Sequence, residues 1–208
     1  MIDSAQLAGF IAVAALLVIS PGPNTLLILS NSVAGGRSAG MATVLGVEAG
    51  TLVHTVAAAV GVSAVLASSM AAFDAMKYAG AVYLAVLGVR ALRSRGTPLP
   101  NVDEGRMNAG RTFRQAVLAS ILNPKAAVFF LAFLPQFVRR ENGHVPGQFI
   151  VLGLTVAVIG LTFGSLLTIG ASRAQAWLQD DGAARWRERL TGSVLIGLSL
   201  RLAFTHQS

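Results

Sequence analysis

The chain has no cysteine and few charged residues, and each shortage narrows what the protein can be. Without cysteine there is no disulfide, no thiolate nucleophile and no cysteine-ligated metal, and the redox compartment is left undetermined. Only 12% of the 208 residues are charged and 54% are hydrophobic, whereas soluble globular domains carry about 25% charged residues. A water-soluble fold of this size is excluded, because too few polar side chains are present to cover its surface.

The signatures of enzymes and of metal sites are also missing. The three histidines, His54, His144 and His206, lie far apart and show no ligand spacing, so no metal site is predicted. No phosphate-binding glycine loop, Ser/His/Asp order or pair of catalytic carboxylates occurs in a recognisable spacing. We therefore expect neither an enzyme nor a bound cofactor.

Long apolar runs fill the chain. A membrane helix needs about 20 largely apolar residues, so the chain has room for about six crossings and for no separate soluble domain. The expected crossings are residues 5–30, 41–70, 71–92, 116–138, 149–171 and 190–204. The last run is short and contains Arg201, so five crossings followed by a surface helix remain the alternative. We predict an all-α, polytopic membrane protein with six transmembrane helices.

The basic residues that give the net charge of +7 lie mostly between these apolar runs. We therefore expect no nucleic-acid partner. Most of the 16 Lys and Arg residues fall in the first, third and fifth connections. Because cytoplasmic loops accumulate Lys and Arg, these connections are predicted to be cytoplasmic and both termini periplasmic. Residues 1–3 lack the cationic segment of a cleavable signal peptide, so the first apolar run is expected to be retained.

The two halves of the sequence are similar to each other. A shift of 103 positions aligns residues that interrupt the apolar runs: Ser20-Pro21 with Asn123-Pro124, Arg37 with Arg140, Gly50 with Gly153 and Gly61 with Gly164. We interpret residues 1–95 and 112–208 as three-helix repeats joined by a cytoplasmic linker, residues 96–111. Because three is odd, the second repeat would enter from the opposite side, which is the inverted topology of many secondary transporters.

Helices 1 and 4 are predicted to be broken at proline, at the same place in each repeat. A proline inside a membrane helix frees backbone carbonyls, which then need other partners. Ser20 and Asn123 are both favoured N-cap residues, and each precedes a proline. Two half-helix starts near the midplane would attract a carboxylate, and the freed carbonyls a cation. The alternative is a packing kink repaired by neighbouring helices.

Ionisable residues inside the predicted crossings are the other candidates. Lys125 lies deep in its crossing, where a cation needs a partner; it binds a substrate carboxylate or pairs with Glu48, against a structural or snorkelling role. Glu48 is a proton carrier or a ligand for a substrate ammonium, against a buried salt bridge. His54 could share the proton-coupling role, although packing is favoured. Gly46 and Gly50 are interpreted as helix-packing residues.

These motifs resemble those of the LysE/RhtB amino-acid exporters of bacterial inner membranes. The resemblance spans nearly the whole chain and rests on residues 20–24, Ser-Pro-Gly-Pro-Asn, on Gly46-Val47-Glu48-Ala49-Gly50 with His54, on Lys77-Tyr78-Ala79-Gly80, on Asn123-Pro124-Lys125, and on residues 191–203 of the last helix. It implies efflux of an amino acid or close derivative, in exchange for protons. It also implies that the functional residues are Pro21, Gly22, Pro23, Asn24, Asn123, Pro124 and Lys125, and Glu48 fits one subgroup.

The predicted function is therefore a secondary transporter that exports an amino acid from the cytoplasm by proton antiport with alternating access. Its predicted partners are the amino acid, protons and the lipid bilayer, and the small-residue faces around Gly153 and Gly164 leave room for a homodimer. Two alternatives remain open at this point. One is a structural or signalling membrane protein whose buried polar residues only fix helix register, and the other is an ion channel.

Overall fold

The computed structural model describes residues 4–94, 108–179 and 181–204, and within these ranges it contains helices and no strand. The all-α fold class is thereby confirmed for the described residues. The elements are α1 (Ser4–Ile19), α2 (Pro23–Ala57), η1 (Ala58–Val62), α3 (Ser63–Ser68), α4 (Met70–Arg93), α5 (Ala109–Ile121), α6 (Pro124–Val128), η2 (Phe129–Phe133), η3 (Leu134–Phe137), η4 (Arg140–Asn142), α7 (Val145–Gln179) and α8 (Asp181–Phe204). Most of the predicted linker lies outside the described residues, although α5 already begins inside it.

Fewer helices are long and apolar enough to cross a membrane than the six predicted. Within the described residues there are three, Pro23–Leu66, Met70–Arg93 and Val145–Ala171. The pair Ala109–Ile121 and Pro124–Phe137, bent by 48°, makes a fourth candidate. The described residues thus contain three or four candidate crossings by helix length and composition, which supports a multi-pass membrane protein. Residues 6–19 form a shorter apolar helix.

Helix α2 reverses direction at Gly36, which has φ +67° and ψ −164°. The side chains of Asn31 and Thr43 hydrogen-bond at 2.8 Å, although twelve residues of straight helix would separate them by about 18 Å along the axis. Residues 23–35 and 37–57 are therefore two helical arms. The loop expected around Arg37 is wrong, because one glycine in a left-handed conformation makes the reversal without a loop.

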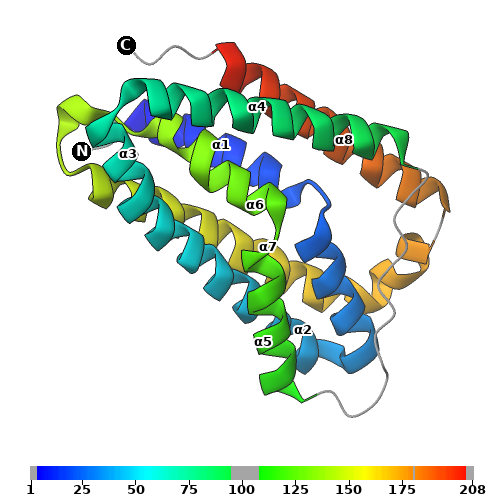
Figure 1. Cartoon of the computed structure of the whole chain (residues 1–208). Coiled ribbons are helices and arrows are strands. Elements are labelled where there is room, and N and C mark those ends of the chain that lie inside the picture. Colours follow the sequence, from blue (N-terminus) through cyan, green and yellow to red (C-terminus); the bar gives the residue numbers. More distant parts are fainter. Residues whose placement is uncertain (1–3, 95–107, 180, 205–208) are drawn as a thin grey trace.

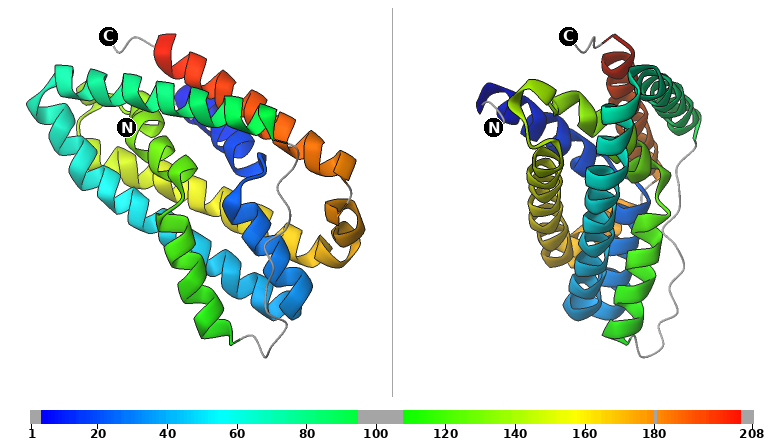
Figure 2. Two further views of the ribbon diagram at one scale, coloured as in Figure 1. Left: turned by 45° about the vertical axis from the view of Figure 1, so that its right-hand side comes forward. Right: turned by 60° about the vertical axis from the view of Figure 1, so that its left-hand side comes forward.

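Two long antiparallel helix pairs organise the molecule (Figures 1 and 2). The second arm of α2 packs on α7, and α4 packs on α8. Glycines allow the close approach: Gly153 and Gly164 of α7 lie directly against Thr55 and Val44 of α2. Both are buried within the chain. The expectation that they form a free face for a homodimer is therefore wrong, because α2 already covers them.

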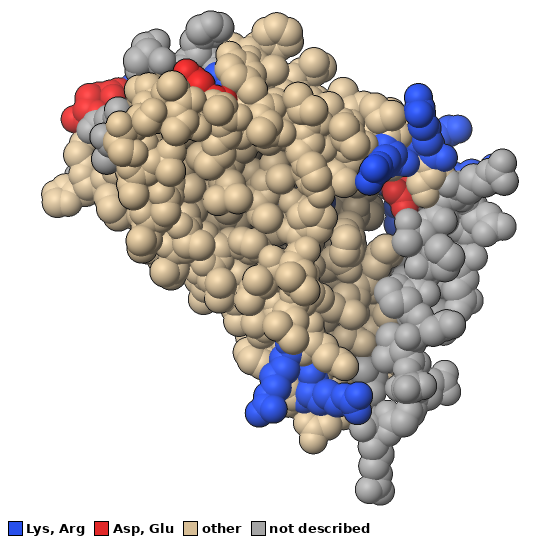
Figure 3. Space-filling view, in the orientation of Figure 1, with Lys and Arg blue, Asp and Glu red and all other residues tan. Residues whose placement is uncertain are grey.

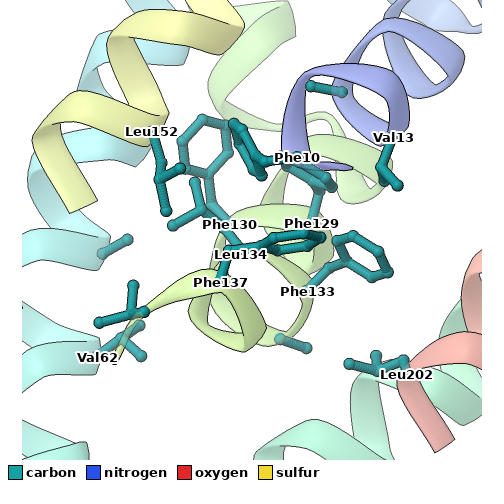
Figure 4. Close-up of a cluster of buried hydrophobic side chains, with 14 of the residues drawn as sticks. Phe10, Val13, Val62, Phe129, Phe130, Phe133, Leu134, Phe137, Leu152 and Leu202 are labelled. Atoms are coloured by element: carbon teal, nitrogen blue, oxygen red, sulfur yellow. The ribbon is translucent and has the colours of Figure 1, made fainter. Parts of the chain in front are cut away.

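The apolar core lies where α1 meets the non-α segments η2 and η3. Figure 4 shows the rings of Phe10, Phe129, Phe133 and Phe137 gathered there. Phe10 and Phe137 meet edge to face with ring centroids 5.1 Å apart, and Phe129 stacks on Phe133 at 5.5 Å. These rings are buried, so this end of the bundle is closed by aromatic packing. The π segment η2, which carries Phe129 and Phe133, is of a kind frequent at functional sites.

Charged side chains gather at the ends of the bundle (Figure 3). Lys and Arg atoms cover the start of α5 and the region where α4 ends and α8 begins, and the wide surface between the ends is almost free of charge. Two lysines depart from this pattern, Lys77 and Lys125, and Lys125 is described below. Lys77, within the expected crossing 71–92, is buried on α4 with its ammonium 5.0 Å from the ring centre of Tyr78, so an aromatic face contacts the charge.

Candidate functional site

Both predicted proline positions interrupt the helices. Helix α1 ends at Ile19 and α2 begins at Pro23, while α5 ends at Ile121 and α6 begins at Pro124. Asn123 is an N-cap as predicted, because its side chain accepts a hydrogen bond from the Lys125 backbone N–H at 3.0 Å.

The predicted N-cap role of Ser20 is wrong. The N-cap of α2 is Gly22, with Pro23 at the first helical position. The N–H of Ser20 still donates to the Leu16 carbonyl at 3.0 Å, so Ser20 belongs to the end of α1. The second proline delays the start of the next helix, since Pro23 is suited to that first position and its predecessor is held out of the helix.

The two breaks lie side by side and are hydrogen-bonded to one another. The Lys125 ammonium, just after the second break, donates to the Ser20 carbonyl at 2.7 Å. The Thr191 hydroxyl on α8 donates to the Pro21 carbonyl at 2.6 Å. In the other direction, Nε2 of His54 on α2 lies 3.2 Å from the Ser120 carbonyl, one turn before the second break. Each half of the chain therefore supplies side chains for carbonyls that belong to the other half.

A small cavity, which we call the inner cavity, lies beside the breaks and has a volume of about 90 Å³. Glu48, Asn24, Thr51, Asn123 and Lys125 line it together with apolar side chains. Its volume suits a few water molecules or one small polar group.

Three buried polar atoms near the inner cavity have no hydrogen-bond partner among the described residues: Oε2 of Glu48, Oδ1 of Asn24 and Oγ of Ser20. The first two are acceptors only. Since a buried unpaired acceptor is costly, their arrangement favours a ligand that donates hydrogen bonds. Glu48 also lies directly against Gly160 of α7, where any side chain would displace its carboxylate.

A second cavity, which we call the vestibule, has a volume of about 400 Å³. It adjoins the inner cavity, because Gly22, Asn123 and Lys125 line both. The other lining residues include four leucines from three helices, and also Arg187 and Glu188 at the start of α8. Lys125 and the two breaks therefore form the wall between a small polar cavity and a larger, mainly apolar one.

The remaining predicted residues fall around these cavities. Pro21 and Pro23 line the vestibule, as does Pro124. Gly46 and Gly50 face α5, where a side chain would meet Phe113, Ala116 or Ser120. The ring of His54 stacks on Phe130 with centroids 5.6 Å apart.

The pairing of Lys125 with Glu48, one of the two roles expected for Lys125, is not formed in this structure. Lys125 bonds Ser20 instead, and Oε2 of Glu48 has no partner. Among the described residues, no group of three or more His, Asp or Glu side chains could hold a metal ion.

Sequence reasoning missed Ser120, Thr191 and Gly160. The Ser120 hydroxyl donates to the Val47 carbonyl at 2.9 Å and lies 3.4 Å from the amide nitrogen of Asn24. Its place one turn before a helix break could have marked it, because serine often bonds neighbouring backbone groups there. Thr191 contacts Pro21, and Gly160 contacts Glu48. Both partners lie more than a hundred positions away in the sequence, so no local pattern marks these contacts.

The chain is similar in sequence to known membrane proteins over most of its length. The chain is 29% identical to the uncharacterized membrane protein YrhP of Bacillus subtilis, over 94% of this chain and 97% of that protein. It is 32% identical to the uncharacterized membrane protein PA4757 of Pseudomonas aeruginosa, over 90% of this chain and 89% of that protein. It is 27% identical to the homoserine/homoserine lactone efflux protein of Salmonella typhimurium, over 93% of this chain and 94% of that protein.

No solved structure gives a significant match. The model of the LysE type translocator family matches residues 15–206, which is nearly the whole chain. The protein therefore belongs to the LysE type translocator family.

Proposed function

We propose that the protein exports an amino acid or a close derivative from the cytoplasm in exchange for protons. The observation that carries this proposal is the meeting of the two helix breaks at the bond between Lys125 and Ser20, beside a cavity that holds the unpaired Glu48 oxygen. Family membership supports a translocator, and the Salmonella relative named for homoserine and homoserine lactone efflux supports a substrate of this class.

The site has complementary places for the two charges of a zwitterion. The free N–H groups at the start of α2 and the ammonium of Lys125 favour a carboxylate. Oε2 of Glu48 and Oδ1 of Asn24 both accept hydrogen bonds, and an ammonium donates three. In this proposal the substrate carboxylate displaces the Ser20 carbonyl from Lys125, and its ammonium binds Glu48.

Proton coupling would follow from competition at Glu48. A carboxylate that binds either the substrate ammonium or a proton exchanges one for the other, and His54 lies one helical turn and a half further along α2 as a second proton-binding group. One proton that moves inward across 100 mV releases about 2.3 kcal/mol, which sustains roughly a fifty-fold substrate gradient. Alternating access would require the aromatic packing of Phe10, Phe129 and Phe137 to open.

We further propose six crossings arranged as two inverted repeats, residues 1–95 and 112–208, joined by a cytoplasmic linker. α1 and the first arm of α2 would together make the first crossing, and the second arm of α2 the next. α8 would make the sixth, with Arg201 near its end over the ring of Phe137 at 4.9 Å. The antiparallel pairs α2 with α7 and α4 with α8 support this proposal, since each joins equivalent helices of the two repeats.

The membrane would be the bacterial inner membrane, with both termini periplasmic. The start of α1 and the end of α8 lie at the same end of the bundle (Figures 1 and 2), as an even number of crossings requires. The exposed arginines at the end of α4 and the start of α5 favour a cytoplasmic position for the opposite end.

The test is transport by the purified full-length protein in proteoliposomes. Vesicles loaded with a panel of amino acids are assayed for efflux with and without an imposed pH gradient. The expected result is efflux of one or more amino acids that the gradient accelerates, lost in Glu48→Gln and in Lys125→Ala. Glu141→Gln, which alters an exposed carboxylate on η4, is the matched control and should behave as the parent.

Two outcomes would contradict the proposal. Flux that is independent of the pH gradient and unsaturable would indicate a channel. Absence of efflux for every substrate, with correctly inserted protein, would indicate a structural or signalling role.

A further inference from the structure

The vestibule is more than a passage to the inner cavity. It is lined by Leu26 and Leu27 of α2, Leu87 of α4 and Leu195 of α8, and its volume is more than four times that of the inner cavity. A mainly apolar cavity with a few polar groups at one wall is the usual form of a small-molecule site. We therefore propose that the vestibule is a second substrate subsite, which holds the amino-acid side chain and admits uncharged side chains.

The proposal rests on the proposed function and deepens it, because it names the substrate class. The inner cavity, at about 90 Å³, accommodates the polar head of an amino acid and little more. The two cavities share Gly22, Asn123 and Lys125 as their common wall. A substrate whose carboxylate binds Lys125 and whose ammonium points to Glu48 must therefore project its side chain away from the inner cavity, into the vestibule.

The charges of the vestibule restrict that side chain further. Lys125 and Arg187 both line it, and Glu188 is its one acidic lining residue. Once the substrate carboxylate has bound Lys125, the charges of Arg187 and Glu188 balance, so the vestibule offers no excess negative charge to a cationic side chain. Such a side chain would lose water in an apolar cavity without a compensating partner, and this opposes its binding. Side chains such as that of lysine are excluded, whereas those of leucine, threonine or homoserine are accepted.

Two small residues in the wall make the subsite testable. Ala91 on α4 and Ala119 on α5 line the vestibule, so a larger residue at either position would occupy the space of the substrate side chain. Ala79 lies on α4 as well, but it is exposed and lines neither cavity. The pair Ala91→Leu and Ala79→Leu therefore compares the same chemical change on the same helix, inside and outside the proposed subsite.

The experiment measures initial rates of exchange in proteoliposomes for radiolabelled alanine, leucine, phenylalanine and lysine, with the full-length protein. In the parent, leucine is expected to be exchanged and lysine to be exchanged at least tenfold more slowly. Ala91→Leu is expected to lower the rate of leucine relative to alanine by about tenfold or more, the effect of crowding a pocket by a few methyl groups. Ala79→Leu is expected to leave that ratio unchanged.

A reciprocal variant guards against misfolding of the first. Leu87→Ala enlarges the vestibule and is expected to raise the rate of phenylalanine relative to leucine. Exchange of lysine as fast as leucine by the parent, or unchanged rate ratios in both vestibule variants, would overturn the subsite while export itself stands. If the parent exchanges no amino acid, the proposed function fails and the subsite fails with it.

Discussion

Gly160→Ala is expected to disable the substrate site while leaving the fold intact. Gly160 lies on α7 directly against the carboxylate of Glu48. A Cβ at this position would lie 2.8 Å from Cδ and 2.9 Å from Oε2 of Glu48, and closer still to Oε1. Non-bonded carbon contacts are most favourable at about 3.5–4.0 Å, so the carboxylate must retreat by about 1 Å.

The expected change in apparent KM follows from the hydrogen bond to the substrate that Glu48 loses when its carboxylate moves. A hydrogen bond to a charged group contributes about 1.5–3 kcal/mol, so a carboxylate displaced from the substrate ammonium raises the apparent KM roughly 10- to 150-fold. Stability should change little, because the displaced atoms are the end of a flexible side chain. Alanine also favours a helix over glycine by about 0.5–1 kcal/mol.

The assay is the concentration dependence of substrate exchange in proteoliposomes, with thermal unfolding in detergent measured on the same samples. Gly170→Ala is the matched control, because it makes the same change on the same helix where no atom lies within 4 Å. An unchanged KM in both variants would refute the reasoning, since the Glu48 carboxylate would then not bind substrate from the position described. A large fall in the melting temperature of Gly160→Ala alone would show that the carboxylate cannot move, and would refute the predicted separation of stability from transport.

Three further substitutions test the parts around Glu48. Lys125→Met removes both the cation and its bond between the breaks; export should be abolished in a counterflow assay, and retention of more than a tenth of the parental rate would contradict the assigned role. Gly50→Ala forces a methyl group against α5, which should cost about 1–3 kcal/mol and lower the melting temperature by at least about 2 °C, whereas Gly197→Ala, which meets no atom within 4 Å, should be neutral. Thr191→Val leaves a backbone carbonyl unpaired at the first break and should cost about 1–3 kcal/mol of stability. An effect no greater than that of Thr162→Val, an exposed threonine whose hydroxyl bonds the Val158 carbonyl of its own helix, would count against it.

The positions of the long helices are predictable from the sequence, because a membrane helix requires a continuous apolar run. Their ends are less predictable: α7 extends from Val145 to Gln179 around the run 149–171, and α8 begins at Asp181, well before the run 190–204. Both breaks were also predictable, since proline removes a backbone donor wherever it stands. A reversal near Arg37 was expected between the first two apolar runs, but the sequence did not show that Gly36 alone would make it without a loop. Its left-handed backbone conformation and the hydrogen bond between Asn31 and Thr43 distinguish this reversal from a continuous helix.

The partners at the site were less predictable than the breaks. Sequence reasoning selected Lys125 and Glu48 because charge inside a membrane is costly, but it could not choose between a mutual ion pair and separate roles. That choice depends on distances between residues far apart in the chain, which follow from the packing of α2 on α7 and not from any local pattern. For the same reason Thr191 was overlooked, because a threonine inside a helix carries no sequence signal of its distant partner.

The hydrogen bond between Thr191 and the Pro21 carbonyl has a consequence for how the protein is made. The two partners are 170 positions apart in the chain, so the first helix break is synthesised long before the hydroxyl of Thr191. Until α8 is inserted, the Pro21 carbonyl needs another hydrogen-bond donor, such as water within the bilayer or a group of the translocation machinery. The proposed substrate site would therefore be completed late in biogenesis, and a nascent chain released before its last helix would lack the hydrogen bond that Thr191 gives to the first break.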